Sequence, residues 1–105
     1  MTPEMRLLRK IQIYCGTKNC LAFHQNVGSV KMADGRFFST GMPQGWPDMI
    51  ILTNNGKAIF CEVKVHPNRP TKEQINTIRV LTERGFLAFV AYSLDEFIEM
   101  TKNVL

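Results

Sequence analysis

Three polar side chains stand in two otherwise apolar segments, and together they could do metal-dependent phosphate chemistry. Asp48 directly precedes the apolar run 49–52, and Glu62 and Lys64 alternate with apolar residues near the end of the segment 58–65. Carboxylate oxygens are ligands that Mg²⁺ and Mn²⁺ prefer. A bound cation would polarise a phosphate and activate water, and a lysine ammonium could stabilise the developing negative charge.

Whether the two carboxylates meet depends on the length of the turn between their strands, because side chains alternate between faces along a strand. A two-residue loop would place Asp48 opposite Val63, and Glu62 would then face away. A three-residue loop over 54–56, or a five-residue loop over 53–57, would place Asp48 directly opposite Glu62. The Asn-Asn-Gly sequence of 54–56 suits the three-residue loop, since its last residue adopts the left-handed conformation. The sequence permits this register without proving it.

In that register the Cβ atoms of Asp48 and Glu62 would be roughly 5 Å apart, and a cation would offset their repulsion. The alternative is a surface Glu-Lys pair on an edge strand and an aspartate that merely begins a strand. Three features favour the site. Glu62 interrupts an apolar strand, Asp48 precedes a buried run, and one hairpin separates them.

The remaining pattern predicts one mixed α/β domain over residues 1–105, with helices packed against a central sheet. Thr2-Pro3 begins a helix that Gly16 would end, and capping boxes at Thr71 and Ser93 begin two more. The expected order is α-β-β-β-β-α-β-α, with strands over 21–32 (weakest at Gly28), 36–39, 49–52, 58–65 and 86–92.

The chain carries a net charge of +4, and this basic excess favours a polyanion such as nucleic acid. No apolar run reaches the roughly 18 residues of a membrane helix, and no signal-peptide pattern begins the chain. We therefore expect a cytoplasmic protein without a membrane partner. Cys15, Cys20 and Cys61 form no CxxC pair, so buried reduced thiols are a better interpretation than a zinc site.

A family resemblance sharpens this interpretation. Residues 45–48 (Gly-Trp-Pro-Asp), followed by a strand, a turn and residues 60–64 (Phe-Cys-Glu-Val-Lys), resemble the PD-(D/E)XK nuclease motif. Residues 70–74 (Pro-Thr-Lys-Glu-Gln), followed by a helix and the Gly85-Phe86 strand, resemble the VRR-NUC group within it. The resemblance covers nearly the whole chain, and its small stand-alone members share further segments, at 26–28, 34–36 and 41–43.

The resemblance implies a restriction-endonuclease-like fold and a Mg²⁺ or Mn²⁺ ion held by Asp48, Glu62 and the main-chain carbonyl of Val63. It implies that Lys64 is catalytic and that Gln74 helps order the site, although Gln74 also fits simple capping-box chemistry. Related resolvases carry a glutamate on the first helix, which Glu4 could match. Its alternative is an acidic residue favoured by the helix dipole.

The activity implied is that of a structure-selective DNA endonuclease, which resolves four-way (Holliday) junctions as a homodimer in a bacterial cell or phage-infected host. A two-fold dimer would present two sites to a two-fold junction. The alternatives are a flap or linear-DNA nuclease with the same site, and a nuclease-like DNA-binding module without turnover. Candidate phosphate contacts, each also explicable as a solvated charge, are Lys31, Arg36, Arg69 and Lys72.

Three further residues lie near the motifs. His24 and Asn26 share a predicted strand face and could approach the site or DNA, but packing or solvent exposure explains them better. Trp46 could stack on a base, and core packing is the better interpretation for it.

Overall fold

The computed structural model describes residues 1–25, 29–39 and 42–105. A four-stranded sheet lies at its centre, in the order β1 (Leu21–His24), β4 (Met49–Leu52), β5 (Ala58–Val63) and β6 (Leu87–Ala91). Strand β4 is antiparallel to both of its neighbours, β1 and β5, and β6 is parallel to β5. Parallel neighbours need a crossover connection, which a helix supplies here.

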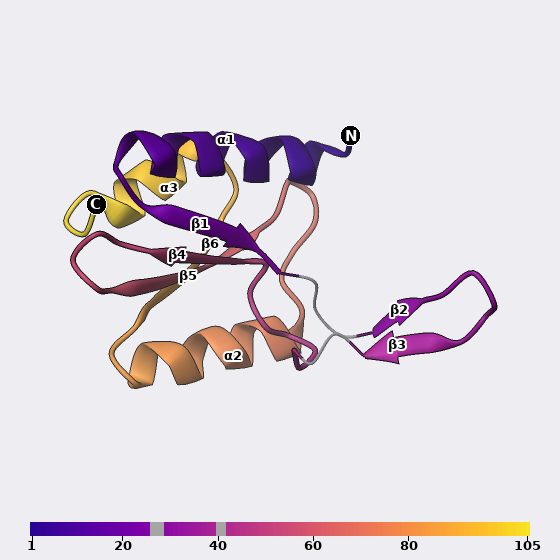
Figure 1. The fold of residues 1–105 in the computed structure, drawn as a ribbon. Coiled ribbons are helices and arrows are strands. Elements are labelled where there is room, and N and C mark those ends of the chain that lie inside the picture. The colour runs from indigo at the N-terminus through magenta and orange to yellow at the C-terminus, as the bar shows by residue number, and fades with distance from the viewer. Residues whose placement is uncertain (26–28, 40–41) are drawn as a thin grey trace.

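Helices cover both faces of the sheet (Figure 1). Helix α1 (Pro3–Thr17) and helix α3 (Leu94–Thr101) lie on one face, and helix α2 (Lys72–Glu83) crosses the other between β5 and β6. The larger core lies under α1 and α3, and its fully buried side chains include Ile11 and Phe97. The smaller cluster lies under α2. The structure thus confirms the predicted α/β class and the order of its elements, with one predicted strand divided in two and one helix end displaced.

The first difference is the segment 21–32, which forms two strands instead of one. Strand β2 (Ser29–Lys31) pairs with β3 (Phe37–Ser39) in a separate two-stranded sheet, and the predicted weak point at Gly28 lies outside the described residues. The predicted turn at Asp34-Gly35 joins these strands, and Gly35 has φ 88°. Figure 1 shows this hairpin projecting beyond the central sheet. A propensity pattern cannot separate two strands that continue in different sheets.

The second difference concerns the end of α1. Gly16 was expected to stop the helix, but α1 continues through it to Thr17. The left-handed residue is Asn19, with φ 60°, and asparagine tolerates that conformation better than most residues. The predicted helix starts are confirmed, because Thr2, Thr71 and Ser93 each cap a helix with a side-chain oxygen. No helix in the described part of the chain is long and apolar enough to cross a membrane.

Candidate active site

The turn between β4 and β5 has the length that brings the carboxylates together. The Thr53 N–H donates to the Lys57 carbonyl at 2.9 Å, which leaves a three-residue loop between them. Gly56, the last residue of that loop, has φ 85°, as the predicted turn requires. The ladder runs back to Met49 opposite Cys61. The next step in the same register places residue 48 opposite residue 62, so the predicted register is confirmed.

Asp48 exchanges hydrogen bonds with residues 62 and 63 across the end of this ladder. The Asp48 N–H donates to Glu62 Oε1 at 3.2 Å, and the Val63 N–H donates to Asp48 Oδ2 at 3.1 Å. Each carboxylate therefore accepts a main-chain N–H from the other strand. Asp48 is further fixed by the residue that follows β1, because its carbonyl accepts the N–H of Gln25 at 2.7 Å. The two acidic side chains are held at one end of the sheet by three strands.

The second oxygen of Glu62 is surrounded by donors. Gln74 Nε2 donates to Glu62 Oε2 at 2.9 Å, and Lys64 Nζ lies 3.8 Å from the same oxygen. Glu62 is only 1% exposed, whereas the Lys64 side chain keeps 15% exposure. The glutamate is thus almost sealed from solvent, and the lysine beside it is slightly more exposed.

Gln74 serves the helix and the site at once. Its N–H donates to Thr71 Oγ1 at 3.2 Å, and its Oε1 accepts the Thr71 N–H at 2.8 Å, which completes a capping box. The capping box takes up the amide oxygen and leaves the NH₂ group to face Glu62. The two interpretations of Gln74 from the sequence are therefore compatible.

Burial and charge raise the pKa of Glu62 to about 8. The largest cause is desolvation in the buried site, the next is the negative charge of Asp48, and the nearby Lys64 ammonium opposes both. A divalent cation would supply the positive charge that this pair lacks. The donor set, two carboxylates with a main-chain carbonyl available on Val63, has the oxygen chemistry of Mg²⁺ or Mn²⁺. The residues present therefore fit such an ion.

Close packing against α2 fixes the segment that carries Asp48. Gly45 has φ 93°, and a Cβ added there would lie 2.7 Å from Glu73 Cβ and 2.8 Å from the Glu73 carbonyl oxygen. A larger residue at position 45 would push the segment away from the helix. Trp46 packs edge-on against Phe60 with ring centroids 5.7 Å apart, so its core interpretation is confirmed. The positioning role of Gly45 was not predicted, although the Gly-Trp-Pro-Asp motif contains this residue.

The hydrogen bond of the Glu4 side chain is made with Asn68 and not with the residues of the carboxylate pair. Glu4 Oε1 accepts a hydrogen bond from Asn68 Nδ2 at 3.2 Å, which ties the first turn of α1 to the loop after β5. Among residues 1–25, 29–39 and 42–105, no three His, Cys, Asp or Glu side chains are grouped closely enough to hold a metal ion. A metal role for Glu4 stays a prediction.

The remaining described candidates are exposed on the surface. Lys31 and Arg36 belong to the projecting hairpin, where Arg36 forms an exposed ion pair with Asp34 at 2.7 Å. Arg69 and Lys72 are exposed at the start of α2, next to the active-site strand in the chain. His24 is exposed at the end of β1, and Asn26 lies outside the described residues. The three cysteines are buried free thiols, as expected.

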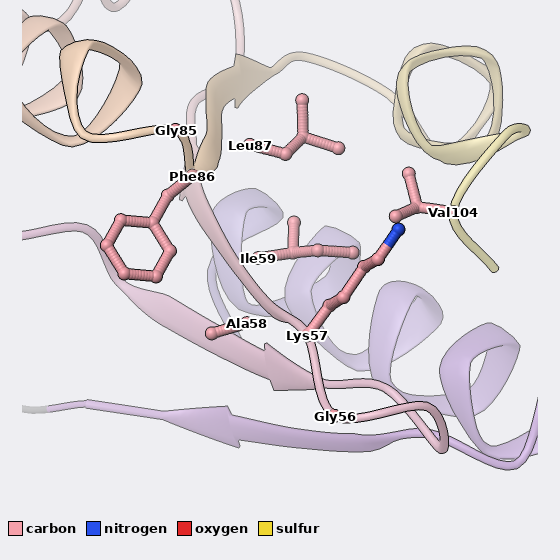
Figure 2. A pocket seen from close by; sticks show the side chains of 8 residues that line it. All are labelled: Gly56, Lys57, Ala58, Ile59, Gly85, Phe86, Leu87 and Val104. Carbon is pink, nitrogen blue, oxygen red and sulfur yellow. The ribbon is translucent and has the colours of Figure 1, made fainter.

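A cavity of about 430 Å³ lies at the opposite end of the β4–β5 hairpin. Figure 2 shows its lining, in which Lys57 extends toward Val104 among apolar side chains from β5 and the start of β6. Lys57 is the only ionisable side chain among its eight lining residues. The lining of this cavity includes no carboxylate, histidine or cysteine that could bind a cation, so it is not the candidate metal site.

A mixed sheet between helices, with an acidic pair and a lysine at the end of one hairpin, defines a restriction-endonuclease-like α/β domain. The chain belongs to the VRR-NUC domain family, whose model matches residues 19–95. A solved structure described as a VRR_NUC domain shares its fold, with a TM-score of 0.72 and 20% identity over 100% of both chains. A comparison with curated proteins gives no match. The family membership makes this a nuclease-type domain, which implies DNA as its substrate class.

Proposed function

We propose that this protein is a Mg²⁺- or Mn²⁺-dependent DNA endonuclease that resolves four-way junctions as a homodimer. One observation carries the nuclease chemistry: Asp48 and Glu62 converge at a buried end of the sheet with Lys64 beside them. The raised pKa of Glu62 supports this proposal, because a structural acid would gain nothing from a site that opposes its ionisation.

Asp48, Glu62 and the main-chain carbonyl of Val63 would hold the cation. When bound, the cation supplies Lewis-acid polarisation of the phosphate and makes water a better nucleophile at neutral pH. In the hydrolysis, a water oxygen bonds to phosphorus, one phosphorus–oxygen ester bond breaks, and the leaving oxygen ends as a hydroxyl group.

The chain's own side chains have separate tasks in this proposal. Lys64, whose Nζ lies 3.8 Å from Glu62 and whose side chain is 15% exposed, stabilises the negative charge that develops on the phosphate. Gln74 holds Glu62 in place through its 2.9 Å hydrogen bond. The exposed cations on the projecting hairpin and at the start of α2 would contact the DNA backbone on either side of the site.

The choice of a junction and a homodimer is supported by the resemblance to stand-alone VRR-NUC proteins. Symmetry adds a reason, because a dimer with a two-fold axis would present two equivalent sites to a junction with the same symmetry. A domain of 105 residues would also enlarge its buried core by dimerising.

The test is cleavage of a four-way junction, a flap and a linear duplex with Mg²⁺ or Mn²⁺, beside a measurement of solution mass. Asp48→Ala and Lys64→Ala should abolish cutting. Lys57→Ala removes a lysine from the other end of the same hairpin, so this matched control should cut like wild type.

The outcomes separate the parts of the proposal. Tight junction binding without cutting of any substrate would show a binding module without turnover. Equal cutting of linear duplex and junction would overturn the junction preference, and a monomeric mass on the junction would overturn the dimer. Wild-type rates for Asp48→Ala or Lys64→Ala would overturn the site.

A further inference from the structure

The main-chain hydrogen bonds between β4 and β5 stop at Met49 and Cys61, although the antiparallel pattern could continue to residues 47 and 63. In an antiparallel pair, every second residue exchanges main-chain hydrogen bonds with the residue opposite. Thr53, whose N–H donates to the Lys57 carbonyl at 2.9 Å, fixes which residues these are. Met49, opposite Cys61, is the last position of this kind within the two strands. The next would be residue 47 opposite residue 63.

Residue 47 is a proline, which has no N–H to donate to the Val63 carbonyl. The Val63 N–H is also diverted from the main chain, since it donates to Asp48 Oδ2 at 3.1 Å. The following residue, Lys64, donates its N–H to Ala91 on the β6 side. Because the N–H and C=O of one strand residue point to the same side, the Val63 carbonyl points to the β4 side, next to Asp48.

We propose that Pro47 is a positioning residue that keeps the Val63 carbonyl out of the β-ladder and available to the active-site cation. This inference rests on the proposed function, and it concerns a residue that touches neither substrate nor ion. The Pro47 side chain is fully buried, so it is not exposed for contact with substrate. Pro47 acts by lacking the main-chain N–H that any other residue could donate to the Val63 carbonyl.

An ordinary residue at position 47 would create a competition. Its N–H could donate to the Val63 carbonyl and extend the ladder by one pair. A cation would then have to displace that bond before it could use the carbonyl oxygen. One net hydrogen bond is worth about 1 kcal/mol, which corresponds to roughly a fivefold loss of metal affinity.

The first experiment measures Mn²⁺ binding by titration calorimetry without DNA, so that it does not depend on cleavage. Pro47→Ala should bind Mn²⁺ about fivefold more weakly than wild type. Pro43→Ala is the matched control, since it makes the same change at an exposed position of the same segment and should bind like wild type.

The second experiment follows the new amide of Pro47→Ala by hydrogen exchange with NMR detection. The residue 47 N–H should be protected in metal-free protein, and Mg²⁺ should reduce that protection. Weakened Mn²⁺ binding with an unprotected amide would mean a loosened segment, and would overturn the inference. Unchanged Mn²⁺ binding would also overturn it. Absence of Mn²⁺ binding by wild type would instead overturn the proposed function.

Discussion

The two ends of the β4–β5 hairpin satisfy their polar groups in opposite ways. At the turn, Thr53 and Lys57 exchange neutral main-chain and hydroxyl hydrogen bonds, at 2.9 Å for each N–H. At the other end, two carboxylates face each other across the same ladder, and one of them is 1% exposed. The turn needs nothing beyond the chain, whereas burial and the charge of Asp48 oppose the ionisation of Glu62 at the carboxylate end, and a cation would offset that opposition.

This difference separates stability from chemistry along one hairpin. The turn fixes the register, and the register decides whether Asp48 and Glu62 meet. The carboxylate end costs stability, because it opposes the ionisation of Glu62. Changes at the carboxylate end should therefore affect activity most, and changes at the turn should affect stability alone.

The largest effect is expected for Asp48→Asn, which removes one charge and keeps an oxygen to accept the Val63 N–H. Cleavage should fall roughly 1000-fold, because the cation loses a charged ligand. The metal-free protein should become more stable at pH 8, since the charge that raises the pKa of Glu62 is gone. Cleavage assays and thermal unfolding in EDTA measure the two effects. A variant that loses both activity and stability would show that Asp48 has a structural role instead.

The next effect is a pH dependence of stability and metal binding. Glu62 has a pKa of about 8 in the folded protein against a usual value of 4.5. Between these pH values the folded state keeps a proton that the unfolded state has released. Metal-free stability should therefore fall as pH rises from about 4.5 to about 8.

Cation affinity should change in the other direction, because binding displaces the Glu62 proton. It should rise by up to about tenfold per pH unit below pH 8. Thermal unfolding across this range, with EDTA and with excess Mn²⁺, tests both expectations. Metal-free protein that gains stability from pH 5 to pH 8 would contradict the assignment of the raised pKa.

A smaller effect is expected for Gln74→Glu, which tests the role of Gln74 in capping α2 separately from its hydrogen bond to Glu62. Glutamate also completes a capping box with Thr71, so the helix start should persist. The donor to Glu62 is replaced by an oxygen, and cleavage should fall roughly tenfold as Glu62 loses a positioning hydrogen bond. Thr71→Ala is the complement, with about 1 kcal/mol lost from stability and little change in cleavage. Equal activity losses in both variants would mean that capping alone matters.

The sequence predicted this part of the molecule well for local reasons. Turn length, strand alternation and the conformation of Gly56 together determine the register between Asp48 and Glu62. The capping box likewise lies within four consecutive residues. These features depend on neighbours in the chain, so a single sequence contains them.

Contacts between distant segments could not be predicted in this way. The close packing of Gly45 against Glu73, where an added Cβ would lie 2.7 Å from Glu73 Cβ, depends on how a loop packs against a helix. The hydrogen bond between Glu4 and Asn68 joins residues 64 positions apart. The assignment of β1 and β2 to different sheets also follows from tertiary packing.

The smallest effect on activity is expected for Thr53→Val, at the turn. Valine keeps the buried, β-branched shape and removes the hydroxyl that accepts the Lys57 N–H at 2.9 Å. The free energy of unfolding should fall by about 1 kcal/mol, while cleavage and Mn²⁺ affinity stay at wild-type values at 25 °C. The three-residue loop would still set the register, because the main-chain pair between residues 53 and 57 remains. If Thr53→Val weakened Mn²⁺ binding without unfolding the protein, the two ends would be coupled, and the separation of stability from chemistry would be wrong.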